Sequence, residues 1–414
     1  MKSLALMDLM KIAVHDPKLL ESSRLYESAF TRNRKMPFAS ALTFLLDMRK
    51  TTLQTRLNMF FEHNGDDAPM SQQAFSKLRM NFDHTPFVSL HNTIVKHEYS
   101  GEYELPLWNG YHIFGIDGSY LQLPRTEELY RDFGTHGQKT QCPAAGISVL
   151  FDLLHGWALD PIITAAGMNE RAECEKHIDF LCAQLPKIAK NSIVIMDRGY
   201  PSVDLLHKLR CAGVKFVVRC NSVFVSEINN APVGDCVVTL KNGLSVRVVK
   251  FALSSGEIET LATNLFDLPE NQFPELYAMR WGIETAYFHF KRELCVEKFS
   301  GKSPNSIRQD FWASMVLLNA VAVFQREADA AAAERQRDKQ LKHQNRARTS
   351  DLIVTLRDKF VFAVLCGGNT PDDFDLEKII QTMARAVSPV RPGRSFPRVH
   401  KPSLTANSQL KSHL

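Results

Sequence analysis

The stretch from Tyr277 to Lys291 carries four side chains that together could act on a phosphodiester. Tyr277, Arg280, Glu284 and Lys291 follow one another at intervals of three, four and seven residues. At about 100° per residue, an α-helix would bring all four within roughly 60° of arc, on one polar stripe. The carboxylate could hold a metal ion, while the two cations and the phenol could bind phosphate oxygens. For a lone polar stripe, the alternative is a solvated face with ion pairs.

Two aspartates follow apolar stretches that are typical of buried strands. The run 111–116 stops at Asp117, and the run 192–196 is followed by Asp197. We expect each strand to end at its acid, at a sheet edge where the chain turns outward and leaves room for a ligand. For either aspartate alone, a cap or turn residue is the alternative.

Asp117, Asp197 and Glu284 lie far apart in the sequence, so only a fold can gather them. Three carboxylates in one cleft would repel each other and would repel DNA, and divalent cations would remove that repulsion. Mg²⁺ suits oxygen ligands, and two ions can stabilise the entering and leaving oxygens of a displacement at phosphorus. In such a two-ion site, with Mn²⁺ as the substitute ion, Asp117 would bridge both ions, Asp197 would hold one and Glu284 the other.

The elements expected around these acids form a mixed α/β core. Three strands, a helix, a strand, a helix and a strand follow one another between residues 111 and 219, and the second of these helices is expected at 203–211. This order matches the opening of the ribonuclease H-like fold. Four further β-like runs, at 223–226, 236–240, 244–251 and 258–264, indicate a β insertion before the Tyr277 stretch.

With these blocks in place, the sequence resembles the bacterial insertion-sequence transposases of the DDE class, specifically the family-four type with its Tyr-x2-Arg-x3-Glu-x6-Lys signature. The stretch from Tyr277 to Lys291 matches all four letters of that signature. The segments FGIDGSYLQLP and IVIMDRGYPS resemble the first and second aspartate blocks, and the β insertion is also a family trait. The three blocks occur in the family's order, over about residues 105 to 300.

The resemblance implies a role for each matched residue. The three acids would be the catalytic, metal-binding triad of a ribonuclease H-like core, while Tyr277, Arg280 and Lys291 would contact phosphates at the transposon end. Family members cut double-stranded DNA at terminal inverted repeats and join the freed 3′ hydroxyl to a target, as a synaptic homodimer. The residues do not indicate whether a hairpin intermediate is used.

Weaker signals indicate further DNA contacts close to the acids. Trp281 could stack on an unpaired or flipped base, and core packing is the alternative. Arg198 and Lys139 could contact the DNA backbone, or they could be ordinary surface cations.

The N-terminal region has the outline of a helix-turn-helix DNA reader. A helix at 53–61, a turn and a short polar helix at 71–80 follow one another, and the short helix carries Lys77 and Arg79. A simple helix pair is the alternative. Near the other end, a basic run at 335–348 could contact phosphates or remain a solvated surface.

Composition is that of an ordinary globular protein. A net charge of +5 permits a polyanionic partner without requiring one. The eight cysteines include no C-x-x-C pair, so we expect reduced thiols; Cys174, His177 and Cys182 have near-metal spacing but no fourth ligand nearby. No apolar run approaches transmembrane length and no signal peptide is evident, so we expect a cytoplasmic, nucleoid-associated protein without a membrane partner.

These observations predict five regions. They are a helical DNA-binding region at 1–104, a ribonuclease H-like core at 105–220 and 265–326, a β insertion at 221–264, a basic helical region at 327–387, and a flexible basic tail at 388–414. Two other functions stay open. One is a metal-dependent nuclease without strand transfer, and the other is a non-catalytic, sequence-specific DNA-binding protein.

Overall fold

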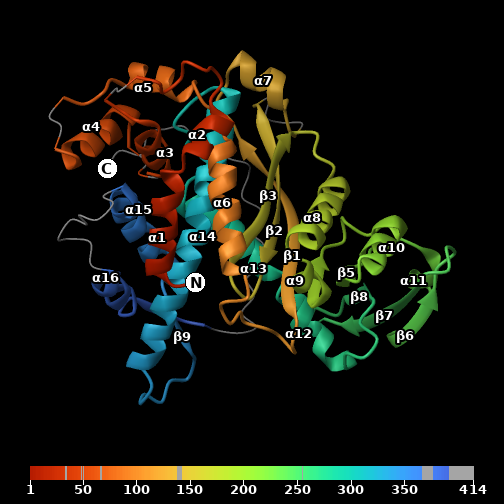
Figure 1. Ribbon diagram of the computed structural model, residues 1–414. Helices are drawn as coiled ribbons and strands as arrows, with labels where there is room; N and C mark the ends of the chain where they lie inside the picture. Colours follow the sequence, from red (N-terminus) through yellow and green to blue (C-terminus); the bar gives the residue numbers. More distant parts are fainter. Residues whose placement is uncertain are drawn as a thin grey trace. The chain divides into compact units, whose positions relative to one another are not determined.

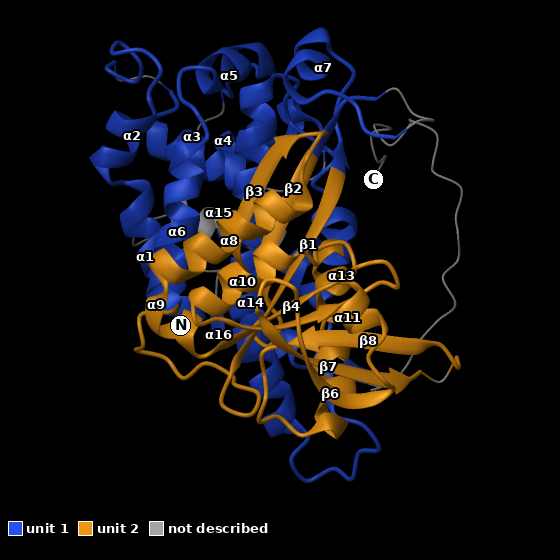
Figure 2. Cartoon of the chain, turned by 90° about the vertical axis from the view of Figure 1, so that its right-hand side faces the viewer, with its two compact units in different colours: residues 1–98, 121–145, 288–414 blue, residues 99–120, 146–287 orange. Residues whose placement is uncertain are grey.

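The computed structural model describes residues 1–390 except 33–34, 48, 50, 66–67, 138–141, 254 and 366–375. It has two compact units (Figure 2). The helical unit comprises Met1–Glu98, Leu121–Ala145 and Phe288–Leu414, and the sheet unit comprises Tyr99–Tyr120 and Gly146–Tyr287. The N-terminal and C-terminal helical regions, which the sequence analysis separated, therefore belong to one unit. The expected tail from residue 391 onward lies outside the described residues.

The helical unit consists mainly of α-helices (Figure 1). Its elements are α1 (Ser3–Val14), α2 (Pro17–Ser23), α3 (Phe38–Leu46), α4 (Leu53–His63), α5 (Gln72–Arg79), α6 (Thr85–Glu98), α7 (Glu127–Phe133), the π-helical turn η2 (His289–Glu293), α14 (Pro304–Arg335), β9 (Asn345–Ala347), α15 (Thr349–Leu365), α16 (Leu376–Met383) and β10 (Val387–Pro389). None of the helices in the described part of the chain has the length and apolarity needed to cross a bilayer.

Helix α14 is the central element of the helical unit. It spans 32 residues, and α1, α3, α6, α15 and α16 pack against it. Its first turn is fixed by a capping box, in which Ser303 and Ser306 bond each other's backbone N–H, and Pro304 occupies the first helical position. Its buried face also carries polar residues, among them Gln309 and Asp310, so the unit contains buried hydrogen-bond networks as well as apolar contacts.

The sheet unit alternates strands and helices. Its elements are β1 (His112–Gln122), β2 (Ala144–Asp152), β3 (Trp157–Ala165), α8 (Glu170–Gln184), α9 (Pro186–Lys190), β4 (Ser192–Met196), α10 (Val203–Cys211), β5 (Lys215–Arg219), α11 (Ser226–Asn229), β6 (Gly234–Thr239), β7 (Ser245–Ala252), β8 (Ile258–Thr263), η1 (Glu270–Gln272), α12 (Phe273–Ala278) and α13 (Trp281–Phe288).

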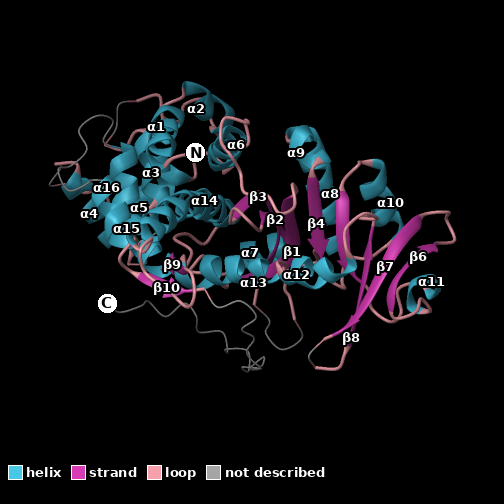
Figure 3. Ribbon diagram, turned by 90° about the horizontal axis from the view of Figure 1, so that it is seen from below, coloured by secondary structure: helices cyan, strands magenta, loops and turns pink. Residues whose placement is uncertain are grey.

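These strands form one eight-stranded sheet in the order β3-β2-β1-β4-β5-β8-β7-β6 (Figure 3). Strand β4 pairs in parallel with both β1 and β5, whereas β8, β7 and β6 continue the sheet in antiparallel pairs. The parallel centre requires crossover connections, and α8 to α10 provide them. The expected mixed α/β architecture is therefore present, and the strands of the β insertion extend the same sheet.

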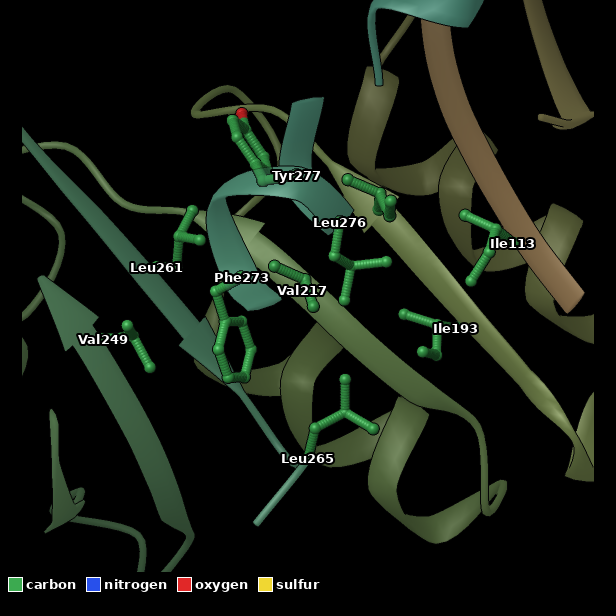
Figure 4. Packing of buried hydrophobic residues seen from close by; sticks show 10 residues of the cluster. Ile113, Ile193, Val217, Val249, Leu261, Leu265, Phe273, Leu276 and Tyr277 are labelled. Atoms are coloured by element: carbon green, nitrogen blue, oxygen red, sulfur yellow. The ribbon is translucent and has the colours of Figure 1, made fainter. Parts of the chain in front are cut away.

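Helix α12 packs against one face of the sheet. Phe273, Leu276 and Tyr277 pack with Ile193 and Ile195 of β4 and with the other residues of one apolar cluster (Figure 4). Because side chains alternate along a strand, Met196 points to the opposite face, where its sulfur contacts Cys174 of α8 at 3.6 Å. Helices therefore cover both faces of the sheet beside the ends of β1 and β4.

Three local expectations from the sequence are wrong. Strand β1 does not end at Asp117 but continues to Gln122. The run 223–226 is a turn leading into α11 and not a strand. The stretch from Tyr277 to Lys291 is not one uniform α-helix, because α12 ends at Ala278, α13 begins at Trp281 and η2 is π-helical.

Candidate functional site

The parallel pairing of β1 with β4 brings the two aspartates to neighbouring positions. His112 pairs with Ser192 and Gly115 pairs with Ile195. Continuing this register by two residues puts Asp117 opposite Asp197, on strands that are typically about 4.8 Å apart. Asp197 directly follows the last residue of β4, whereas Asp117 lies where β1 extends beyond its partner. Two acids 80 positions apart (197 − 117) therefore lie side by side beyond the paired segments of two central strands.

The carboxylate of Asp117 is destabilised by its surroundings. Burial and the negative charge of Asp197 raise the pKa of Asp117 to about 6, although the N–H of Gly118 and the charge of Arg280 lower it. The Gly118 N–H donates to Oδ1 of Asp117 at 2.9 Å, and the Gly199 N–H donates to Oδ1 of Asp197 at 2.7 Å. The negative charge of Asp197 acts on Asp117 more strongly than the positive charge of Arg280 does, which favours binding of an added cation.

Glu284 lies on α13 and pairs with Arg280. Its Oε1 accepts a hydrogen bond from Arg280 at 3.3 Å, and its side chain is 34% exposed. Arg280 lies within electrostatic range of Asp117, since its charge lowers the pKa of that acid. The backbone between α12 and α13 forms hydrogen bonds between residues three apart, so Arg280 sits on a tightened turn before the helix that carries Glu284.

Two aromatic rings flank Arg280 and have different environments. The guanidinium carbon lies 5.9 Å from the centre of the Tyr277 ring and 5.4 Å from that of Trp281. Tyr277 is 8% exposed, and Figure 4 shows its hydroxyl pointing away from the apolar cluster. Trp281 is 56% exposed, so the alternative of core packing for its ring is wrong.

Glu170 is an acid of this site that the sequence analysis missed. A methyl group added at Gly118 would lie 3.1 Å from its Oε1, and one added at Gly199 would lie 3.2 Å from its Oε2. The carboxylate therefore lies beside both aspartate turns, and burial and the charge of Asp197 raise its pKa. The only signal in the sequence is Asn169, a helix cap that predicts a helix start at Glu170 but not its neighbours.

A buried polar network fixes α8 against the sheet. Ser148 Oγ lies 2.9 Å from Nε2 of His177, and Nδ1 of His177 lies 2.7 Å from Oδ2 of Asp160. Ser148 and His177 are fully buried, so this serine-histidine-aspartate arrangement offers no substrate access and serves packing. Both ring nitrogens of His177 are engaged, which leaves none for the metal site that its spacing from Cys174 suggested.

The donor chemistry around the two aspartates fits a hard divalent cation. Asp117, Asp197 and Glu284 offer only oxygen ligands, which Mg²⁺ prefers. Tyr200 OH, Tyr277 OH and Arg280 Nε are buried without a hydrogen-bond partner among the described residues, which is typical of a site that binds a polar ligand. In this conformation, no three acidic, histidine or cysteine side chains in the described part of the chain are close enough to hold a metal ion. The site thus fits in charge and donor type, whereas the spacing of its carboxylates is not that of a closed metal cage.

The remaining predicted contacts have diverse environments. Lys77 and Arg198 are exposed, and Lys291 lies on η2. Arg79 is 2% exposed, and its guanidinium bonds Gln309, Ser300, the Ser306 carbonyl and Asp310, with 3.0 Å to Oδ1 of Asp310. These four bonds and its burial give Arg79 a structural role, since a guanidinium held in this way is not exposed to DNA. Lys139 lies outside the described residues.

Comparison with known proteins identifies the family. The family described as "Transposase DDE domain" matches residues 108–320, slightly more than half of the chain. The chain belongs to this DDE transposase-domain family. The matched segment contains all three predicted acids, and the resemblance inferred from the signature and the two aspartate blocks is confirmed.

Two individual proteins are similar to this member of the family. It is 26% identical over 240 residues to "Transposase InsG for insertion sequence element IS4" of Escherichia coli (strain K12), which covers 52% of this chain and 52% of that protein. The match therefore spans about half the length of that relative. The fold is similar to the "Cryo-EM structure of piggyBac transposase synaptic complex with hairpin DNA (SNHP)", with a TM-score of 0.51 and 11% identity over 97% of this chain and 88% of that chain. The expected ribonuclease H-like fold class is confirmed.

Proposed function

We propose that this protein is a DNA transposase. It cuts double-stranded DNA at the terminal inverted repeats of its element and joins the freed ends to target DNA. The observation that carries the proposal is the pairing of β1 with β4, whose register puts Asp117 opposite Asp197. Glu284 bonds Arg280, whose charge acts on Asp117. The same residues lie within the segment that the transposase DDE-domain family matches.

The three acids would hold the divalent cations on which the chemistry of this family depends. When bound, Mg²⁺, or Mn²⁺ in its place, lowers the pKa of a water molecule and stabilises charge on the phosphate oxygens. Asp117 and Asp197 contribute carboxylates from neighbouring strands, and Glu284 contributes one from α13. Glu170 adds negative charge beside them, which increases the attraction for a cation.

The proposed DNA contacts come from residues of both units. Arg280 binds a phosphate, and the exposed ring of Trp281 stacks on an unpaired base. Tyr277, Lys291, Arg198 and Lys77 are further contacts, whereas Arg79 is left out because its guanidinium is buried and bonds residues of its own unit. A homodimer holding two element ends is the proposed assembly.

Substitution of single acids tests this proposal. Asp197→Ala and Glu284→Ala should each abolish Mg²⁺-dependent cutting of a duplex that carries the inverted repeats flanking the gene. Binding of that duplex should stay within a few-fold of the wild type, since these acids hold cations and not DNA. Cutting and joining are measured on labelled duplexes in gels, and binding by fluorescence anisotropy in Ca²⁺.

A matched control is Glu175→Ala, which removes a 45% exposed carboxylate of α8 that pairs with Lys208 at 3.7 Å. It should cut normally. If Asp197→Ala or Glu284→Ala cuts at the wild-type rate in Mg²⁺, the assignment of the site is wrong. Cleavage of any sequence with no joined product would instead identify a nuclease without strand transfer.

A further inference from the structure

The hydroxyl of Tyr287 bonds the backbone at Asp117. It donates to the carbonyl oxygen of Asp117 at 2.7 Å, and the whole Tyr287 residue is 8% exposed. A buried bond of this length is a fixed link, because breaking it leaves a buried acceptor unsatisfied. The link joins the strand that carries one predicted acid to the helix that carries another.

The bonded carbonyl lies in the part of β1 that extends beyond β4, one of the two neighbours of β1 in the sheet. Pairing with β4 runs from His112 to Gly115, and β4 itself ends at Met196. Asp117 thus lies two residues beyond the paired segment, where strand pairing with β4 no longer restrains the backbone. The Tyr287 hydroxyl supplies a restraint at that position.

The ring of Tyr287 also packs against the sheet. Its ring packs edge-on against Phe151 of β2, with the ring centres 5.5 Å apart. One turn earlier, Ile283 packs on β1 so closely that a methyl group added at Gly115 would lie 2.5 Å from its Cδ1. Glu284 stands three residues before Tyr287, on the neighbouring turn of α13. The position of the Glu284 backbone over β1 is therefore set by Ile283 and Tyr287 together.

We propose that Tyr287 is a positioning residue for the reaction, because its hydroxyl fixes the distance between the backbone segments that carry Asp117 and Glu284. This inference rests on the proposed function of those acids. It assigns no contact with substrate to Tyr287. The role belongs to the hydroxyl alone, since the ring would pack against Phe151 without it.

Tyr287→Phe removes only that hydroxyl, and Tyr99→Phe is its matched control. Tyr99 is also a buried tyrosine of the sheet unit, and its hydroxyl donates to Oδ2 of Asp152 at 2.6 Å. Both variants lose one buried hydrogen bond, so both should lower the melting temperature by a few degrees. Only Tyr287→Phe should weaken Mn²⁺ binding to the DNA-free protein, by about tenfold in calorimetric titration, as expected when a group that orients a metal ligand is lost.

Kinetics on the cleavable duplex give a second readout. Tyr287→Phe should lower kcat by about tenfold with little change in KM, whereas Tyr99→Phe should leave both near the wild-type values. Equal Mn²⁺ affinity and equal kcat in both variants would overturn the proposal. If the wild type binds Mn²⁺ but cuts no DNA, the proposed function fails, while the Mn²⁺ titration still decides the role of Tyr287.

Discussion

At the residue scale, the ionised form of Asp117 is less stable in the folded protein than it would be in water. Asp117 is partly buried beside Asp197, and its pKa is raised to about 6 from an ordinary value of 3.8. The folded protein therefore binds this proton more tightly than the unfolded chain does. Stability from this group is fully present below pH 3.8 and is lost as the pH rises through about 6. At neutral pH, the ionised carboxylate lowers the stability of the folded protein, and a bound cation would offset this effect.

Asp117→Asn should therefore stabilise the metal-free protein at pH 7.5, by about 1–3 kcal/mol, because the amide keeps the shape and removes the charge. The gain should shrink toward pH 4, where the wild-type acid is also neutral. Urea unfolding in EDTA at the two pH values measures both effects. Adding Mn²⁺ should raise the stability of the wild type but not that of the variant. Equal stability of the two proteins at pH 7.5 would contradict a destabilised carboxylate at Asp117.

At the element scale, β4 and α10 of the sheet unit could be predicted because recognisable sequence features mark where each begins and ends. The predicted strand at 192–196 and the predicted helix at 203–211 have the bounds of β4 and α10. An apolar run followed by Asp197 and the cap Ser202 account for these two results. The neighbouring positions of Asp117 and Asp197 were also accessible, since parallel neighbouring strands place their ends together, whereas the approach of Glu284 to them stays a prediction.

Other features depend on contacts that no local pattern encodes. Glu170 lies beside both aspartate turns because α8 packs on the sheet, where His177 and Cys174 contact strand residues. The π-helical turn carrying Lys291 follows an apparently regular helical pattern, yet the N–H of Leu294 bonds the carbonyl of His289, five residues back. The helical twist per residue therefore changes on both sides of α13. The four polar side chains from Tyr277 to Lys291 consequently do not form the single stripe that an unbroken α-helix would give.

Gly115→Ala should disturb the seating of α13 on β1. The added methyl would lie 2.5 Å from Cδ1 and 2.9 Å from Cγ1 of Ile283, so the helix or the side chain must move, at about 1–3 kcal/mol. Ile283→Val removes Cδ1 and should recover part of this loss in the double variant, although alone it is mildly destabilising. Urea unfolding of the four proteins measures the coupling.

The control for this cycle is Gly167→Ala, because no heavy atom lies within 4 Å of the methyl group that it adds. Its unfolding free energy should stay close to that of the wild type. Strictly additive effects of Gly115→Ala and Ile283→Val would show that α13 is not seated through this contact.

At the scale of the whole molecule, the predicted residues are divided between the two units. The three acids, Arg280 and Trp281 belong to the sheet unit, whereas Lys77 and Lys291 belong to the helical unit. A net charge of +5 is modest for a DNA-binding protein of 414 residues. Affinity for DNA should therefore depend on specific phosphate contacts more than on the overall charge of the protein, and individual lysines should have measurable effects.

Lys291→Ala tests whether one such contact exists. If Lys291 binds a phosphate, its loss should weaken binding of the element's end and reduce the slope of log K against log salt by about 1, because fewer counterions are released. Lys241→Ala is the control, since it removes the same charge from the exposed turn between β6 and β7. Its slope should equal that of the wild type. Anisotropy titrations from about 50 to 200 mM salt measure both variants. A slope for Lys291→Ala that matches the wild type would show that Lys291 does not contact DNA. The assignment of the three acids would not change, because their role is tested by DNA cutting and not by DNA binding.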